Sequence, residues 1–310
     1  MIYFIISIMD LNGPLMKAMK AVNFISGSSM KEEDIKKHRE SVEKVSRLAS
    51  PKGDISLERF NIGDIACESV KSVSNFNPHY VILYVHGGGY LSGGLDYARI
   101  LAIKLAVATG FTTFTFAYRL APEHSYPAAI EDGLSVWEHL TSGMYSPSHV
   151  LLAGDSAGGN LALCLTQKLI AEGKPIPREL LLFSPWTDMT GTADSYETNK
   201  DLDPVLSREF IADAAKAYIA GAGEADDPRF SPLFGSFEGF PPAYIMAGRN
   251  EILLDDSIRL CEKIKEAGGR AALDIEEKGW HVYQQLPIRI ASLAIARLAK
   301  HLAKEINGES

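Results

Sequence analysis

Residues 150–171 read VLLAGDSAGGNLALCLTQKLIA, and this stretch decides the fold. Its first four residues, Val150 to Ala153, form a continuous apolar run, which is typical of a strand buried on both faces. From Asn160 onward the apolar residues recur with the period of a helix. The residues between them, Gly154 to Gly159, are mostly small and leave room only for a sharp turn. The stretch therefore predicts a strand, a tight turn and a helix, with Ser156 at the turn.

The turn Gly154-Asp155-Ser156-Ala157-Gly158 has the form G-x-S-x-G. A turn this tight needs small residues beside the serine, and the two glycines and Ala157 supply them. The serine then stands exposed at a helix N-terminus, where backbone N–H groups favour negative charge. The bare pattern is common by chance, but a strand–turn–helix context is what a nucleophile elbow requires. We predict that Ser156 is a catalytic nucleophile.

The rest of the chain continues the alternation of strands and helices. Further strands are expected at 56–62 and 65–70, which alternate like an antiparallel hairpin, and at 81–85, 112–117, 180–183, 244–247 and 271–275. Helical patterns cover 96–109, 128–140, 160–171, 255–266 and about 284–304. Strands that alternate with helices predict βαβ units. The expected fold class is α/β, with a mostly parallel eight-stranded sheet flanked by helices.

Two segments fall outside this alternation. Residues 14–50 look helical, and residues 189–223 hold a polar loop and a helix over 208–220 but no strand. We interpret residues 1–55 and 189–223 as a helical cap over the carboxyl ends of the strands, where open α/β sheets bind ligands. The catalytic core then comprises residues 56–188 and 224–310.

A second glycine-rich segment, His86-Gly87-Gly88-Gly89, follows the strand at 81–85. Consecutive glycines lose much conformational entropy on folding and pack nothing, so their use is close approach of the backbone. Their N–H groups can then face a developing oxyanion without a Cβ in the way. The alternative is a flexible loop. However, the segment starts where a buried strand ends and precedes the elbow, as the oxyanion loop of esterases does.

A serine nucleophile needs a base, and the base needs an orienting acid. In folds with this elbow the chain order is serine, acid, histidine. Two histidines follow Ser156: His281, in a loop after the last strand, and His301, in a Lys-rich amphipathic helix where we expect a solvated face. His281 is therefore the expected base. His124 precedes the serine and is expected to be structural.

Three carboxylates after the strand at 244–247 are candidates for the acid: Glu251, Asp255 and Asp256. The two aspartates stand where a helix begins, where negative charge also complements the helix dipole. Glu251 lies in the preceding loop, at the carboxyl end of its strand, where triad acids lie. Glu251 is favoured, and Asp255 stays open as the alternative.

At these residues the sequence resembles the hormone-sensitive lipase-like family of bacterial esterases, from about residue 80 to 285. The matching motifs are the H-G-G-G-x-x-x-G signature at 86–93, a family-specific block at 118–129, the elbow at 154–160 and a strand end at 184–188. The resemblance implies the α/β-hydrolase fold, a cap built from the N-terminus and an insertion, and no metal or cofactor. It also implies that the N–H groups of Gly88, Gly89 and Ala157 form an oxyanion hole.

Two positions depart from the family pattern. Its acid motif, G-x-x-D-x-L, reads Gly248 to Leu253 here, with Glu251 in place of the usual aspartate. Ala117 stands where an aspartate often precedes the Tyr-Arg pair, so one polar contact of that block is expected to be missing.

The composition indicates which classes of partner and which cellular compartment to expect. The chain has 310 residues, a formal net charge of −8 and no basic block, so we expect no nucleic-acid partner. Three cysteines with spacings unlike a zinc site favour a reducing cytoplasm. The apolar start Met1–Met9 is far shorter than the roughly 20 residues that span a bilayer, so no stable membrane insertion is expected.

These observations predict a serine carboxylesterase that hydrolyses short-chain acyl esters through Ser156, His281 and Glu251. A small-molecule ester is the expected partner, no cofactor is expected, and a homodimer is left open. The alternatives are an amidase, deacetylase or lipase of the same fold, or a ligand-binding receptor on a hydrolase scaffold. His281 argues against the receptor, because family relatives with that role have lost the base.

Overall fold

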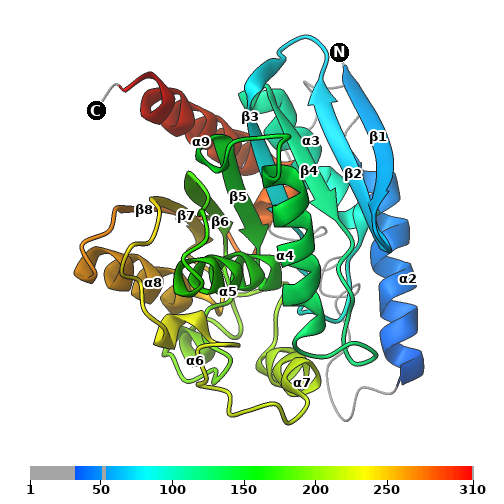
Figure 1. Cartoon of the computed structure of the whole chain (residues 1–310). Helices are drawn as coiled ribbons and strands as arrows, with labels where there is room; N and C mark the ends of the chain where they lie inside the picture. The colour runs from blue at the N-terminus through cyan, green and yellow to red at the C-terminus, as the bar shows by residue number, and fades with distance from the viewer. Residues whose placement is uncertain (1–31, 51–53, 309–310) are drawn as a thin grey trace.

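Eight strands form one mixed sheet in the computed structural model, which describes residues 32–50 and 54–308 (Figure 1). The strands are β1 Ile55–Ile62, β2 Ile65–Ser72, β3 Asn77–Val85, β4 Phe111–Phe116, β5 Val150–Asp155, β6 Glu179–Phe183, β7 Ala243–Gly248 and β8 Ala271–Glu276. Their order in the sheet is β1-β2-β4-β3-β5-β6-β7-β8. The pairs from β4 to β8 are parallel, while β1 and β2 pair antiparallel and join β4 antiparallel. The predicted α/β class is confirmed.

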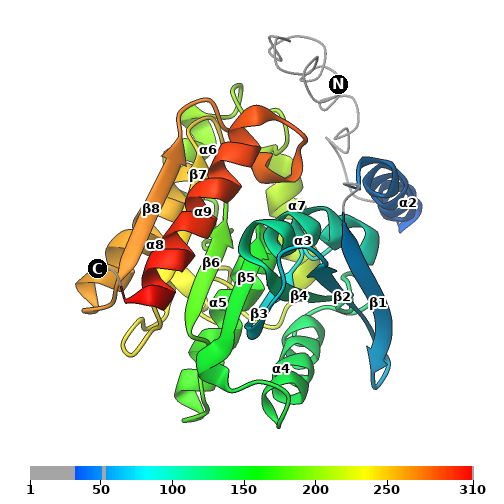
Figure 2. The same cartoon turned by 90° about the horizontal axis from the view of Figure 1, so that it is seen from above.

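The central strands β5 and β6 are mostly apolar because helices cover both faces of the sheet. All six residues of β5 are buried, as are all five of β6. On one face of the sheet, α3 Leu95–Thr109 and α9 Arg289–Asn307 pack against the strands and form one apolar cluster with them. On the other face, a second apolar cluster includes α4 Ala128–Thr141, α5 Ala157–Ala171 and α8 Leu254–Glu266 (Figure 2). The helix α2 Glu32–Ala49 packs on α3.

The segment between β6 and β7 contains two helices, α6 Ser195–Thr198 and α7 Arg208–Ile219. They lie beyond the carboxyl ends of β5 and β6 (Figure 1). The expected helix at 208–220 is therefore present, and the polar loop before it holds the short α6. The described part of the proposed N-terminal cap begins at α2; residues 1–31 lie outside the described residues, as does Met1–Met9.

The last helix differs from the sequence expectation. It begins at Arg289 rather than near Gln284, and a 3₁₀ turn, Tyr283–Gln285, precedes it. The reason is Pro287: a proline disfavours helical backbone at the residue before it, and Leu286 is extended with ψ 152°. Within the described ranges, none of the helices is both long enough and apolar enough to cross a membrane.

Candidate active site

The turn after β5 holds Ser156 in a strained conformation, with φ 53° and ψ −120°. A non-glycine residue at positive φ is uncommon and marks a constrained turn. The chain approaches itself so closely here that a Cβ at Gly154 would lie 2.3 Å from the carbonyl oxygen of Gly158. A Cβ at Gly158 would lie 2.2 Å from the carbonyl oxygen of Val85, at the end of β3. The small residues around the serine are therefore a steric requirement, and the serine sits at the N-terminus of α5.

His281 faces this serine from the loop after β8. Its Nε2 lies 3.0 Å from Oγ of Ser156, and both side chains are buried, so the expectation of an exposed serine is wrong. The next residue, Val282, has a positive φ of 48° and donates its N–H to Oγ of Ser184 at 3.1 Å. Ser184 thus fixes the turn that presents the imidazole. The structure brings together the predicted nucleophile and the predicted base.

Glu251 lies on the far side of the imidazole. Its Oε2 is 3.3 Å from Nδ1 of His281, and the carboxylate is fully buried. Its other oxygen, Oε1, accepts the N–H of Gly248 at 3.3 Å. The contact with the histidine has the distance of an ion pair but not the alignment of a well-formed hydrogen bond. Such contacts are often long in unliganded sites and tighten once substrate binds.

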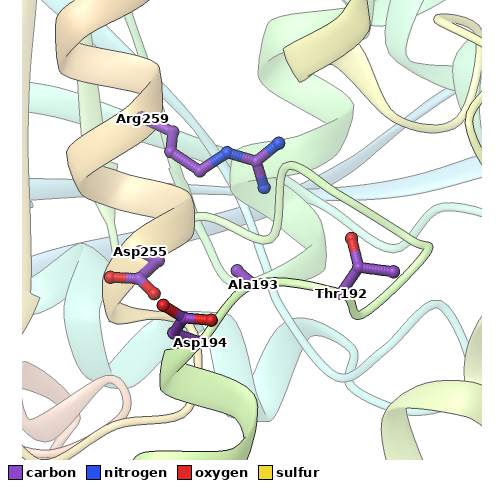
Figure 3. A pocket seen from close by; sticks show the side chains of 5 residues that line it. All are labelled: Thr192, Ala193, Asp194, Asp255 and Arg259. Carbon is purple, nitrogen blue, oxygen red and sulfur yellow. The ribbon is translucent and has the colours of Figure 1, made fainter.

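The two aspartates after Glu251 accept hydrogen bonds from backbone N–H groups away from His281. Asp255 accepts the N–H of Ser195 at 2.8 Å and lines a surface pocket with Thr192, Ala193, Asp194 and Arg259 (Figure 3). Asp256 is buried and accepts the N–H groups of Thr187 and Asp188 at 2.6 and 3.0 Å, rather than serving only the helix terminus. Of the three candidate acids, Glu251 is the one in contact with His281.

Opposing effects set the protonation of His281. Burial lowers its pKa, but the close carboxylate of Glu251 and its charge, together with the charges of Asp203 and Asp155, outweigh burial and raise it. A base with a raised pKa holds the serine proton more tightly once it has taken it. The three carboxylates therefore favour the imidazolium that proton transfer would create.

The glycine-rich loop after β3, residues 86–93, lies over the elbow and is called the oxyanion loop. Gly88 and Gly89 have φ of 111° and 64°. The carbonyl oxygen of Gly88 accepts the N–H groups of Leu91 and Ser92, so the loop folds back on itself. Over the described ranges, the N–H groups of Gly88, Gly89 and Ala157 have no hydrogen bond to a protein acceptor. These N–H groups are therefore available to a ligand.

Asp155, next to the serine, ties this loop to the elbow. Its Oδ1 accepts the N–H of Gly87 at 2.8 Å and the hydroxyl of Tyr84 at 2.5 Å, and its Oδ2 accepts the hydroxyl of Tyr97 at 2.7 Å. Burial raises the pKa of Asp155, and these three donors oppose the shift. Sequence reasoning missed this role, although the acidic residue inside the G-x-S-x-G turn was the signal.

The other histidines are outside this constellation. His86 is buried and stacked on Tyr118 with ring centroids 4.2 Å apart, and burial lowers its pKa to about 4. The expectation of a solvated His301 is wrong: it is half-buried, stacks on Tyr244 and lies 2.5 Å from Oε1 of Glu179. Its helix is amphipathic, but the ring reaches the sheet beside β7. His124 is exposed.

Comparison with known proteins places this site in a family. A family model described as the alpha/beta hydrolase fold matches residues 82–285. A solved esterase from the bacterial hormone-sensitive lipase family superposes with a TM-score of 0.87 and 31% identity, covering 94% of this chain and 97% of that chain. The chain belongs to the hormone-sensitive lipase-like esterases of the α/β-hydrolase fold.

Curated relatives of this esterase support its reaction class. An esterase of Acinetobacter venetianus is 32% identical over 246 residues, which are 79% of this chain and 80% of that protein. An acetyl-hydrolase of Streptomyces hygroscopicus is 32% identical over 236 residues, 76% of this chain and 77% of that protein. The protein is a carboxylic ester hydrolase.

Two further residues of this esterase contact the loop that holds Glu251 and were missed by sequence reasoning. Asn199 and Asp203, both in the segment between β6 and β7, bind the backbone around Glu251. No local pattern marks them, because their partners are about fifty residues away in the chain.

Proposed function

We propose that this esterase is a serine carboxylesterase that hydrolyses short-chain acyl esters through a triad of Ser156, His281 and Glu251. The observation that carries the proposal is the 3.0 Å contact between Nε2 of His281 and Oγ of Ser156, with Glu251 3.3 Å from Nδ1. A nucleophile, a base and an orienting acid in this relation are the requirements for acyl transfer by serine. The same contact favours catalysis over a receptor role.

In the first half of the reaction, Nδ1–H of His281 faces Glu251, which leaves Nε2 free to accept the hydroxyl proton of Ser156. Oγ attacks the ester carbonyl, and the carbonyl oxygen becomes an oxyanion. The N–H groups of Gly88, Gly89 and Ala157 donate to it, at a helix N-terminus where negative charge is favoured. His281 then protonates the leaving alcohol, and the acyl group stays on Oγ.

In the second half, water takes the place of the alcohol. His281 accepts a proton from this water, whose oxygen attacks the acyl carbon. The same three N–H groups hold the second oxyanion. The proton returns from His281 to Oγ as the carboxylic acid leaves, so the enzyme is restored without any cofactor.

A preference for short acyl chains is supported by what lies over the oxyanion loop. A Cβ at Gly89 would lie 3.1 Å from Phe210 and 3.4 Å from Ala214, so α7 closes over the loop. We propose that residues 189–223, together with the N-terminal segment 1–55, form a cap that limits the reach of the site. The name of the Streptomyces relative, an acetyl-hydrolase, agrees with a small acyl group.

Location and partners also belong to this proposal. The thiols of Cys67, Cys164 and Cys261 are all unpaired, which supports a reducing cytoplasm. A small-molecule ester is the proposed partner. That the protein binds no nucleic acid stays a prediction from the sequence. A homodimer stays an alternative that the sequence leaves open.

Covalent labelling tests the nucleophile. A fluorophosphonate should add to the wild-type protein at one site, and Ser156→Ala should neither be labelled nor hydrolyse 4-nitrophenyl butyrate. Equal labelling of both proteins would remove Ser156 from the mechanism. A series of 4-nitrophenyl esters then tests chain length: kcat/KM should peak at about two to eight carbons, as expected for a capped site. A maximum on emulsified long-chain triglycerides would contradict it.

A further inference from the structure

Three side chains of the insertion 189–223 bind the backbone of residues 249–253, the acid loop that joins β7 to α8. The side-chain amide of Asn199 donates to the carbonyl oxygens of Arg249 and Glu251 at 3.1 and 2.9 Å. Asp203 accepts the N–H of Ile252 at 3.0 Å. The hydroxyl of Ser195 donates to the carbonyl oxygen of Ile252 at 2.7 Å. All three side chains are buried or nearly so.

The opposite side of the acid loop is held by β8 and by the loop that carries His281. The N–H of Arg249 donates to the carbonyl oxygen of Glu276 at 2.9 Å. The N–H of Asn250 donates to the carbonyl oxygen of Gly279, two residues before the histidine, at 3.0 Å. The acid loop is thus bound between the core and the insertion, and its backbone polar groups are divided between them.

We infer that Asn199 and Asp203 are positioning residues that set the location of Glu251 relative to His281, so that the insertion takes part in the reaction as well as covering the site. The inference rests on the proposed triad. It gives residues of the insertion a role in proton transfer that is distinct from substrate selection.

The weak direct contacts of the Glu251 carboxylate carry the argument. Its two oxygens have only 3.3 Å contacts, one to Gly248 and one to His281. Those contacts alone would hold a flexible glutamate side chain poorly, since it has one more rotatable bond than aspartate. Packing around the fully buried side chain and the position of its backbone must then place it, and the backbone carbonyl of Glu251 is one of the two that Asn199 binds. A buried side-chain amide with two donors suits two carbonyl groups.

Asp203 adds charge as well as a hydrogen bond. The charged groups that face His281 are Glu251 from the acid loop, Asp203 from the insertion and Asp155 from the elbow. Asp203 itself faces Glu251 and His281, and burial raises its pKa to about 6. Above that pH its negative charge stabilises the imidazolium and so raises the pKa of His281. Removing the charge should therefore lower the pKa of the histidine.

Steady-state kinetics on 4-nitrophenyl butyrate test the inference with Asn199→Ala, Asn199→Asp and Asp203→Asn. Asp201→Asn is the matched control, because it removes an equal charge two residues from Asp203 but lies on the exposed surface. Asn199→Ala should lower kcat on the order of 10- to 100-fold while KM stays within about twofold, as expected when a reacting group is displaced. Asn199→Asp should not rescue, since a carboxylate cannot donate to the two carbonyl groups.

The pH profile supplies the readout that a merely structural role would not change. Asp203→Asn should move the acid limb of kcat/KM to lower pH, because His281 loses a facing negative charge. Asp201→Asn should leave both kcat and the acid limb at their wild-type values. Unchanged kcat and an unchanged acid limb in folded Asn199→Ala and Asp203→Asn would overturn the inference. So would a loss confined to KM, which would make the insertion a substrate-binding element only.

Folding is controlled separately. If Asn199→Ala does not fold, Ser195→Ala removes one hydrogen bond to the carbonyl oxygen of Ile252 in the same loop and one from the N–H of Asp255, and it should lower kcat in the same direction, by a smaller factor. Proton NMR gives a second measurement, since a histidine Nδ1–H shared with a carboxylate resonates far downfield. That signal should weaken or shift in Asp203→Asn and persist in Asp201→Asn, and its persistence unchanged in both would count against the inference.

Failure of the inference and failure of the proposed function are distinguishable. If Ser156→Ala or Glu251→Gln keeps wild-type turnover, the triad itself is wrong. If both are inactive while the insertion variants behave like wild type, the triad stands and the positioning role is refuted.

Discussion

Replacing Glu251 by glutamine isolates the contribution of the acid, because the amide keeps the shape of the side chain and removes its charge. In the proposed mechanism His281 becomes an imidazolium during serine attack, and its Nδ1 lies 3.3 Å from Oε2 of Glu251 in the structure. Two unit charges at that distance attract by about 5 kcal/mol at an effective dielectric constant of 20. Since each 1.36 kcal/mol changes a rate tenfold, kcat of Glu251→Gln should fall by roughly 10³- to 10⁴-fold.

The assay is steady-state turnover of 4-nitrophenyl butyrate, with the rate of fluorophosphonate labelling as a second readout that should fall in parallel. Glu251→Asp keeps the charge on a shorter side chain and should retain part of the activity. Asp255→Asn is the matched control: its side chain can still accept the N–H of Ser195, so kcat should change by no more than severalfold. An inactive Asp255→Asn beside an active Glu251→Gln would refute the assignment.

Three further outcomes are expected. A Cβ at Gly88 would lie 2.2 Å from the carbonyl oxygen of Ser92, so Gly88→Val must displace the oxyanion loop. This variant should lower kcat on the order of 10²- to 10³-fold with little change in KM. Normal turnover in a folded variant would show that the loop does not stabilise the oxyanion. Arg39 of α2 donates to the carbonyl oxygen of Leu91 at 2.6 Å in the oxyanion loop. Arg39→Ala should therefore lower the free energy of unfolding by about 2 kcal/mol in chemical denaturation and should also lower kcat. Unchanged values of both would show that α2 does not support the site. The raised pKa of His281 predicts that kcat/KM falls with decreasing pH along an acid limb centred above pH 6.5, because protonation removes the base. An acid limb centred well below pH 6.5 would contradict the carboxylates assigned around His281.

The sheet and the elbow were readable from the sequence because both are local. A strand covered on both faces is mostly apolar, so Val150 to Ala153 and the similar runs mark the parallel strands by themselves. At Gly154 the turn around Ser156 needs a small residue for a steric reason that acts within five residues, because a Cβ there would meet the carbonyl oxygen of Gly158. The order of serine, acid and histidine then left only His281 in a loop after the last strand.

Other features were decided by segments that meet only in the folded chain. The start of α9 moved because Pro287 acts on the residue before it, and His301 proved half-buried because its ring reaches β7. Asp256, one of the candidate acids, binds the backbone at Thr187 across 69 residues of chain.

What the sequence by itself determined is the set of chemical groups: a serine on an elbow, a glycine-rich loop and a histidine after the last strand. The tertiary structure decided which carboxylate contacts that histidine, and it also brings Asn199 and Asp203 to the backbone around Glu251, about fifty residues away in the chain. Hydrogen bonds between distant backbone and side-chain groups leave no periodicity in the chain. The contacts of Asn199 and Asp203 with the acid loop therefore become visible only when the insertion and that loop pack together.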